Sequence, residues 1–156
     1  MSHKNNRFGS NKFKSTDDSR FERSRNTREE KKVKEDLPKM VFSFKDFDIK
    51  QIPPGQSFDK WQEEKLLAYM LQKFGHICGL NIVEAQQQQV LKIYGDFPLK
   101  TDFKAPQHIT DDVTWAVIMD IKGQKGRVAG HIIDNIFYVV FLDQEHRFYI
   151  TEKRNT

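Results

Sequence analysis

Hydrophobic residues concentrate in three segments in the C-terminal part of the chain, each bounded by polar residues or glycine. In the first, 113–121 (VTWAVIMDI), every second residue is large and apolar. The next two, 127–133 (RVAGHII) and 136–143 (IFYVVFLD), are rich in β-branched and aromatic residues, which favour strands. Asp134 and Asn135 separate them, and both residue types tolerate the positive φ angles of a tight hairpin turn. The pattern therefore predicts three strands, the last two joined as a hairpin.

The position of this turn predicts which hairpin residues lie opposite each other. The predicted cross-strand pairs are His131–Tyr138, Ala129–Val140 and Arg127–Leu142. Because paired residues share a face of the sheet, one face carries Arg127, Ala129, His131, Tyr138 and Val140. The opposite face carries the apolar set Val128, Ile132, Phe137, Val139 and Phe141. We expect the apolar face to pack on helices and the polar side chains to point away from the main core.

The preceding part of the domain combines one strand with two helices. Alternating apolar residues predict a strand at about 41–48, and QIPPGQS ends it. Apolar residues at helical spacing predict a helix over about 58–75, with Ser57 as its N-cap. Asn81 and Glu84 resemble a capping box at the start of a second helix, whose buried face is formed by Val83, Val90, Ile93 and Tyr94. Residues 95–112 are expected to form a long loop that lies against the domain.

The order of these elements predicts the fold class. A strand, two helices and three strands give a two-layer α+β domain, βααβββ, with a helical hairpin packed on a small antiparallel sheet. We assign this domain to residues 39–156.

Residues 1–38 differ from this domain in pattern and in charge. They contain few large apolar residues and no periodicity, so we predict a disordered tail. The tail has eleven Lys and Arg against seven Asp and Glu, a net charge of +4, whereas the rest has fifteen against fifteen, a net charge of 0. Phenylalanines next to cations suit single-stranded nucleic acid, and Arg20, Arg23 and Arg25 are candidate contacts. A solubilising tail is the alternative interpretation.

Several classes of protein find no support in the sequence. The single cysteine, Cys78, allows no disulfide within the chain and fits a reducing, cytoplasmic setting. No long apolar run predicts a membrane span, and no standard catalytic or nucleotide-binding motif is present. We expect no metal and no cofactor. Asp143 and His146, spaced D-x-x-H, could join His131 at a metal, but Asp143 is better explained as the cap of a turn.

The order of elements and the C-terminal sequence RVAGHIIDNIFYVVFLDQEHRFY resemble the RelE/ParE superfamily of bacterial toxins. In that family an arginine opens the penultimate strand, a short turn and an apolar last strand follow, and histidine or tyrosine comes next. The likeness covers roughly residues 41–150 and is closest to ParE-like and HigB-like members of mobile genetic elements.

The resemblance implies a toxin of a type II toxin–antitoxin system that cleaves messenger RNA without a metal. Its partners would be a cognate antitoxin and RNA, free or on the ribosome, and no membrane is implied. Arg127 matches the strand-opening arginine and would hold the phosphate, and His146 and Tyr149 match the C-terminal pair. His131 is a further candidate acid or base. Expected RNA contacts around these residues are Lys122, Lys125 and Arg147.

The sequence also departs from the family. The domain is neutral where ribosome-dependent members are basic, and it carries the 95–112 insertion and the tail. The alternative function is a non-catalytic module of the same fold that binds nucleic acid or protein. The ParE branch, which acts on DNA gyrase, needs none of the catalytic residues. Structural roles also stay open: Arg127 could pair with Asp120, and His131 with Tyr138.

Overall fold

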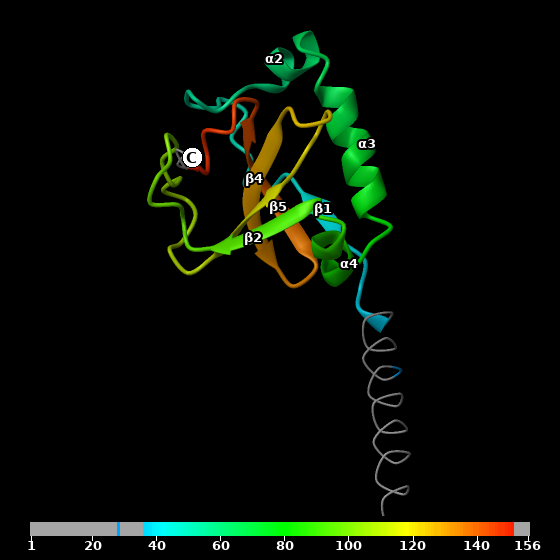
Figure 1. The fold of residues 1–156 in the computed structure, drawn as a ribbon. Coiled ribbons are helices and arrows are strands. Elements are labelled where there is room, and N and C mark those ends of the chain that lie inside the picture. Colours follow the sequence, from blue (N-terminus) through cyan, green and yellow to red (C-terminus); the bar gives the residue numbers. More distant parts are fainter. Residues whose placement is uncertain (1–27, 29–35, 152–156) are drawn as a thin grey trace, which may run out of the picture. The chain divides into compact units, whose positions relative to one another are not determined.

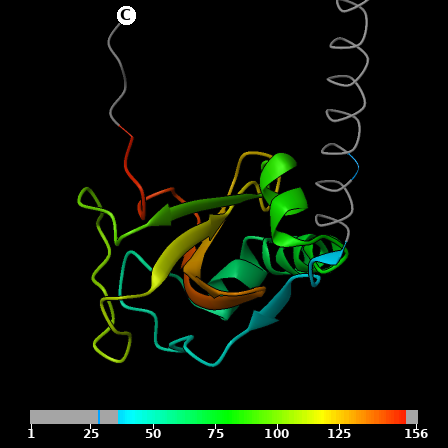
Figure 2. The ribbon, with the colours of Figure 1, turned by 90° about the horizontal axis from the view of Figure 1, so that it is seen from below.

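A five-stranded mixed sheet forms the centre of the domain (Figure 1). The structure is a computed structural model, and it describes residue 28 and residues 36–151. The strands are β1 (Val41–Ser43), β2 (Leu91–Gly95), β3 (Thr114–Ile118), β4 (Arg127–Ile133) and β5 (Ile136–Asp143). Their order is β1-β5-β4-β3-β2, and Figure 2 shows β1 beside β5 at one edge and β2 at the other. The predicted tail lies almost wholly outside the described residues, as do Arg20, Arg23 and Arg25.

Three short helices belong to this domain. They are α2 (Phe58–Glu63), α3 (Leu67–Ile77) and α4 (Ile82–Gln87). Ser57 caps α2 by accepting a hydrogen bond from the backbone N–H of Lys60, and Asn81 and Glu84 form the predicted capping box of α4. The single helix predicted over 58–75 is divided, because Lys65 adopts a φ of 59° and ends the first helix. None of these described helices is long and apolar enough to cross a membrane.

The α+β class is confirmed, but the predicted βααβββ arrangement and the antiparallel sheet are wrong in detail. The segment 91–95 was assigned to a helix, yet it is strand β2 and pairs antiparallel with β3. The helix ends earlier because Gln89 has a φ of 59°. Strand β1 pairs with β5 in parallel, so the sheet is mixed. A three-residue strand at the edge gives no local pattern from which its direction could be predicted.

The hairpin has the predicted turn, but its register shifts in the middle. Asp134 adopts a φ of 55°, and His131 lies opposite Tyr138 as predicted. Beyond these pairs a β-bulge lets Gly130 face Val139 while Ala129 faces Phe141. The predicted pairs Ala129–Val140 and Arg127–Leu142 are therefore wrong, and Arg127 lies opposite Asp143.

Glycine makes this bulge possible. A Cβ atom at position 130 would lie 1.9 Å from the carbonyl oxygen of Tyr138, so only glycine lets the two backbones approach so closely. The extra residue of the bulge is Val140 on β5, which has no single partner on β4. Because of this extra residue, Phe141 lies on the face that carries Ala129, and Leu142 lies on the opposite face. The prediction that Phe141 belongs to the helix-packed core is consequently wrong.

The sheet has a hydrophobic core on each face. The main core joins the helices to one face and includes Trp61, Met70, Ile118, Val128 and Phe137. The second core fills the middle of the other face and consists of Phe103, Trp115, Val117, Ala129, Val140, Phe141 and Phe148. Its cover comes from the 95–112 loop, which lies against the domain as predicted, and from the C-terminal segment 144–151. The polar side chains that were expected along this whole face therefore lie only at the two ends of the second core.

Two backbone hydrogen bonds join the covering segments. The N–H of Asp102 donates to the carbonyl of Arg147 at 3.1 Å, and the N–H of Ile150 donates to the carbonyl of Lys100 at 3.2 Å. The loop and the C-terminal segment thus hold each other over the sheet.

Candidate functional site

Arg127, at the start of β4, lies at one end of the second core. It is half-buried, and its Nε atom is buried without a hydrogen-bond partner in the part of the chain that the structure describes. Within residues 36–151 its guanidinium makes no ion pair with a carboxylate. The guanidinium therefore has no carboxylate partner among the described residues, and the hydrogen-bonding capacity of its Nε is unused.

Asp143, opposite Arg127 on β5, is engaged by the backbone. Its two carboxylate oxygens accept hydrogen bonds from the N–H groups of Arg147 at 2.8 Å and Phe148 at 2.9 Å. This confirms the predicted turn cap. Burial raises the pKa of Asp143, while the two backbone N–H groups, the nearby His146 and Arg127 lower it. The carboxylate fixes the reversal of the chain after β5 and so determines where His146 and Tyr149 lie.

His146 follows in this reversal, with a φ of 59°. Burial lowers its pKa from 6.5, and the positive charge of Arg127 lowers it further. Asp143, Asp120 and a hydrogen bond with the backbone of Gln124 act in the opposite direction. The imidazole is thus mainly neutral at pH 7, which is the form that accepts a proton.

Two tyrosines, Tyr94 and Tyr149, lie near Arg127. The rings of Tyr94 and Tyr149 stack with centroids 4.3 Å apart at an angle of 21°. The ammonium of Lys92 lies 5.1 Å from the centroid of Tyr94 and 5.8 Å from that of Tyr149. Burial raises the pKa of Tyr94 above 10.0, while Arg127 lowers it and Tyr149 raises it. The phenol of Tyr94 is therefore protonated at neutral pH and can donate a proton.

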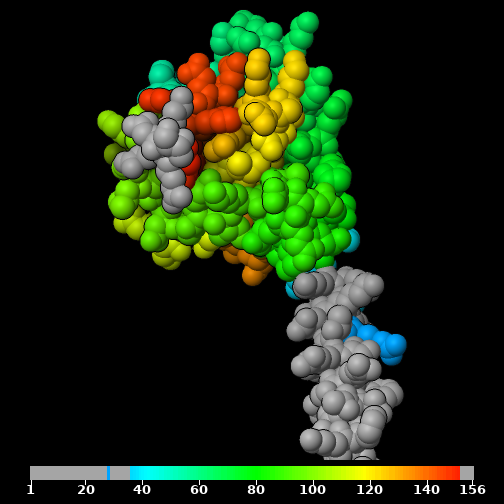
Figure 3. Space-filling model, viewed as in Figure 1, coloured from blue at the N-terminus to red at the C-terminus, as the bar shows by residue number. Residues whose placement is uncertain are grey.

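The structure brings together Arg127, His146 and Tyr149 and adds Tyr94 and Lys92, and we call these five residues the Arg127 cluster. Figure 3 shows its surroundings, where the C-terminal segment (red) meets the segment around residue 120 (yellow) above β2 (green). Sequence reasoning missed Tyr94 and Lys92 because β2 was taken for a helix. The alternation of Leu91 and Ile93 with Lys92 and Tyr94 is the signal that could have identified the strand.

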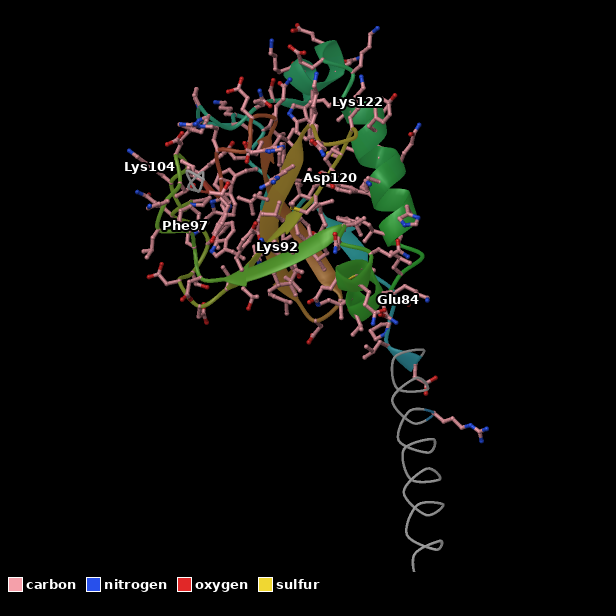
Figure 4. All side chains as sticks on the ribbon, in the orientation of Figure 1. Glu84, Lys92, Phe97, Lys104, Asp120 and Lys122 are labelled. Carbon is pink, nitrogen blue, oxygen red and sulfur yellow. The ribbon has the colours of Figure 1, made fainter. Side chains whose placement is uncertain are left out.

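The three cations predicted to surround the site have different environments. Lys122 lies near α3, with its ammonium 5.0 Å from the ring centroid of Tyr69 (Figure 4). Lys125 is exposed and forms a tight turn with Lys122 through two backbone hydrogen bonds. Arg147 forms an ion pair with Asp102 of the covering loop. Arg147 is thus already engaged by a carboxylate, in contrast to Arg127.

His131 lies at the opposite end of the second core. Only 4% of its surface is exposed, and its Nε2 lies 2.8 Å from a carboxylate oxygen of Asp46. Its ring stacks on that of Tyr138 with centroids 4.7 Å apart, and its Nδ1 is buried without a partner. It lies four positions along β4 from Arg127, a distance of about 13 Å. His131 therefore does not join the Arg127 cluster.

A metal site at His131, Asp143 and His146 has no geometric support. His131 is bound to Asp46, Asp143 caps the turn, and among the described residues no three His, Cys, Asp or Glu side chains lie close enough to hold a metal ion.

Two hollows lie near β5, and neither includes a residue of the cluster. One of about 500 Å³ lies between the segments 48–54 and 102–108, with Val140 and Phe141 among its lining residues. The other, of about 440 Å³, is lined by Gln51, residues 53–57, Lys60, Glu145 and Arg147. The Arg127 cluster thus lies outside both hollows, and Lys92 is its exposed member.

Comparisons with protein-family models, with curated proteins and with solved structures found no match to this chain. The function is therefore inferred from the chemistry of the described residues.

Proposed function

We propose that this protein is a toxin of a type II toxin–antitoxin system that acts as a metal-independent endoribonuclease on messenger RNA. The main support is the Arg127 cluster, in which a cation without an ion pair among the described residues lies within electrostatic reach of a neutral histidine and a protonated tyrosine. These are the groups that RNA cleavage without a metal requires. The resemblance of the C-terminal strands to RelE/ParE toxins supplies the biological role.

Each residue has a specific role in the proposed reaction. Neutral His146 takes the proton of a ribose 2′-OH, and the 2′ oxygen attacks the adjacent phosphorus. Arg127 stabilises the negative charge that develops on the phosphoryl oxygens. The bond from phosphorus to the 5′ oxygen breaks, and a tyrosine, Tyr149 or Tyr94, gives its proton to that oxygen. The products are a 2′,3′-cyclic phosphate and a 5′-OH, and proton transfer from His146 restores the tyrosine.

His131 has no part in this proposal. It is buried against Asp46 and Tyr138, at the far end of the second core. The expected partners remain RNA, with or without the ribosome, and an antitoxin that covers the cluster. The cations of residues 1–38 would add affinity that the neutral domain lacks, and this affinity would fall steeply with salt.

The test is induced expression in bacteria, with growth and transcript integrity followed together, and cleavage assays on the purified protein with and without ribosomes. Wild type should arrest growth and cut transcripts. The Arg127→Ala variant should cleave about a hundred- to a thousandfold more slowly, which corresponds to about 3–4 kcal/mol of lost charge stabilisation.

Arg147→Ala is the matched control, because it removes the same residue type from an existing ion pair with Asp102. It should retain most of the cleavage rate. A wild type that neither arrests growth nor cuts RNA in any of these assays would contradict the proposal.

The second candidate is a non-catalytic module that binds nucleic acid or protein. The observation in its favour is that aromatic side chains of the protein itself fill the middle of the sheet face that would otherwise hold RNA. Binding of RNA without cleavage by wild type would favour this alternative.

A further inference from the structure

We infer that Tyr94 and Tyr149 form a stacking site for one unpaired nucleobase, next to the phosphate that Arg127 holds, so that the ligand is a single-stranded oligonucleotide. The inference rests on the proposed function for its ligand class. It goes further by naming the residues that bind a base and by excluding duplexes as ligands.

The two rings have the geometry of a stacking site. They lie nearly parallel, with centroids 4.3 Å apart, and both side chains are half-buried. Tyr94 comes from the edge strand β2, and Tyr149 comes from the C-terminal segment, which the Asp143 turn holds in place. Because the two segments support each other, the rings are positioned before a ligand arrives. Both rings also pack partly against the second core, so a nucleobase would extend the stack from the part of a ring that stays exposed, since every base has a π-face.

The cations around the rings are suited to the phosphates of the same strand. Lys92 is exposed, and within residues 36–151 it makes no ion pair. Its ammonium lies close to both rings, so a base on the stack would bring its phosphate near Lys92 or Arg127. Cations interleaved with aromatic rings are typical of proteins that bind single strands.

The chain offers a matched comparison on α3. The ammonium of Lys122 lies 5.0 Å from the ring centroid of Tyr69, which resembles the spacing of Lys92 and Tyr94. Tyr69 is exposed, and among the described residues its ring does not stack on a second tyrosine. If a lysine beside a tyrosine were sufficient, both places would bind a base. The stacked pair beside Arg127 predicts binding at the cluster instead.

The test measures binding without cleavage. The full chain is titrated against a fluorescent RNA of about 8 nucleotides with 2′-O-methyl sugars, which lacks the attacking hydroxyl, and anisotropy gives Kd. Tyr94→Leu and Tyr149→Leu should each weaken binding by about five- to a hundredfold. Tyr94→Phe and Tyr149→Phe, which keep the rings, should bind like wild type, and so should the control Tyr69→Leu. The same RNA annealed to its complement should bind far more weakly.

A second measurement does not depend on whether the leucine variants fold. Wild type is irradiated with the same RNA carrying 5-iodouracil, and the cross-linked residues are identified by mass spectrometry. Cross-links at Tyr94 or Tyr149 support the stacking site, and cross-links confined to other aromatic residues overturn it. Equal loss of affinity in Tyr69→Leu and Tyr149→Leu, or equal affinity for single strand and duplex, would also overturn it.

These outcomes separate the stacking site from the nuclease. Tight, tyrosine-dependent binding by a protein that cuts no RNA supports the stacking site and rejects cleavage. Cleavage by Tyr94→Leu and Tyr149→Leu with an unchanged KM, at whatever rate the loss of a proton donor leaves, supports the nuclease and rejects the stacking site.

Discussion

The two ends of the second core carry similar residue types in opposite environments. At one end, His131 is bound to Asp46 and stacked on Tyr138, and almost none of its surface is exposed. At the other end, Arg127, a cation without an ion pair among the described residues, lies near His146 and near Tyr94, whose ring stacks on that of Tyr149. Both histidines were candidate acid–base groups in the sequence. Their surroundings indicate a structural role for the first and a chemical role for the second.

The difference depends on what each carboxylate is bound to. Asp46 binds the imidazole of His131 directly, which satisfies one ring nitrogen inside the protein. Asp143 instead accepts hydrogen bonds from two backbone N–H groups and leaves Arg127 without an ion pair within residues 36–151. A carboxylate near a candidate site can thus either bind the functional side chain itself, as Asp46 does, or hold the backbone around the site, as Asp143 does.

The largest loss of stability is expected from truncating Phe141, which lies in the middle of the second core, between its Arg127 end and its His131 end. Phe141 is buried against Trp115, Phe103 and Phe148, so Phe141→Ala should lower the free energy of unfolding by about 3–5 kcal/mol, as measured by urea denaturation. Leu99→Ala, at a fully exposed position of the covering loop, should stay within about 0.5 kcal/mol of wild type. A small effect of Phe141→Ala would mean that the second core does not join the two ends.

His131→Ala should lower the free energy of unfolding by about 2–3 kcal/mol, because it removes a buried ring and leaves Asp46 without its partner. The hairpin pattern predicts only that His131 points away from the main core, and the burial of its side chain is what should make this variant less stable. His76→Ala, at an exposed site on α3, is the control and should cost less than about 0.5 kcal/mol. Once the variant is folded, its cleavage rate should match that of wild type, and a selective loss of rate would assign His131 to the active site.

The charge of Arg127 should be visible in the titration of His146. Since Arg127 lowers the pKa of His146, Arg127→Gln should raise that pKa toward 6.5, as followed by NMR of the imidazole Cε1 proton. If His146 acts as a base, a higher pKa means that the cleavage rate begins to fall at a higher pH, so the acidic limb of the pH–rate profile should move to higher pH. Arg147→Gln removes an equal charge from the residue next in sequence, and it should leave the pKa of His146 nearly unchanged. Equal shifts in both variants would show that Arg127 has no specific influence.

The smallest effect is expected from the exposed ion pair of the covering segments. Arg147→Ala removes a partner of Asp102, yet the two side chains are 48% and 39% exposed, so the free energy of unfolding should fall by at most about 1 kcal/mol. The effect should shrink further in high salt. A loss of several kcal/mol would mean that this pair, rather than the second core, holds the cover on the sheet.

Local sequence patterns predicted the parts of this protein that local physics controls. The bounds of β4 and β5 match the predicted segments 127–133 and 136–143, because β-branched residues flank a turn that tolerates positive φ. The capping residues Ser57 and Asn81 were likewise identified, since capping depends on neighbours three residues away. Of the candidate site, Arg127, His146 and Tyr149 were indicated by the resemblance of the C-terminal sequence to RelE/ParE toxins.

Contacts between distant segments decided the rest. The bulge arises where Gly130 approaches the backbone of Tyr138, and it reverses the face on which Phe141 lies. The partner of His131 comes from a loop 85 residues away, and Tyr94 reaches Tyr149 from an edge strand. The sequence by itself thus determined the turns, caps and strands of the hairpin, whose energies depend on adjacent residues. Only the tertiary structure decided which polar side chains are enclosed and which stay open to a ligand, because burial depends on what the remainder of the chain packs against them.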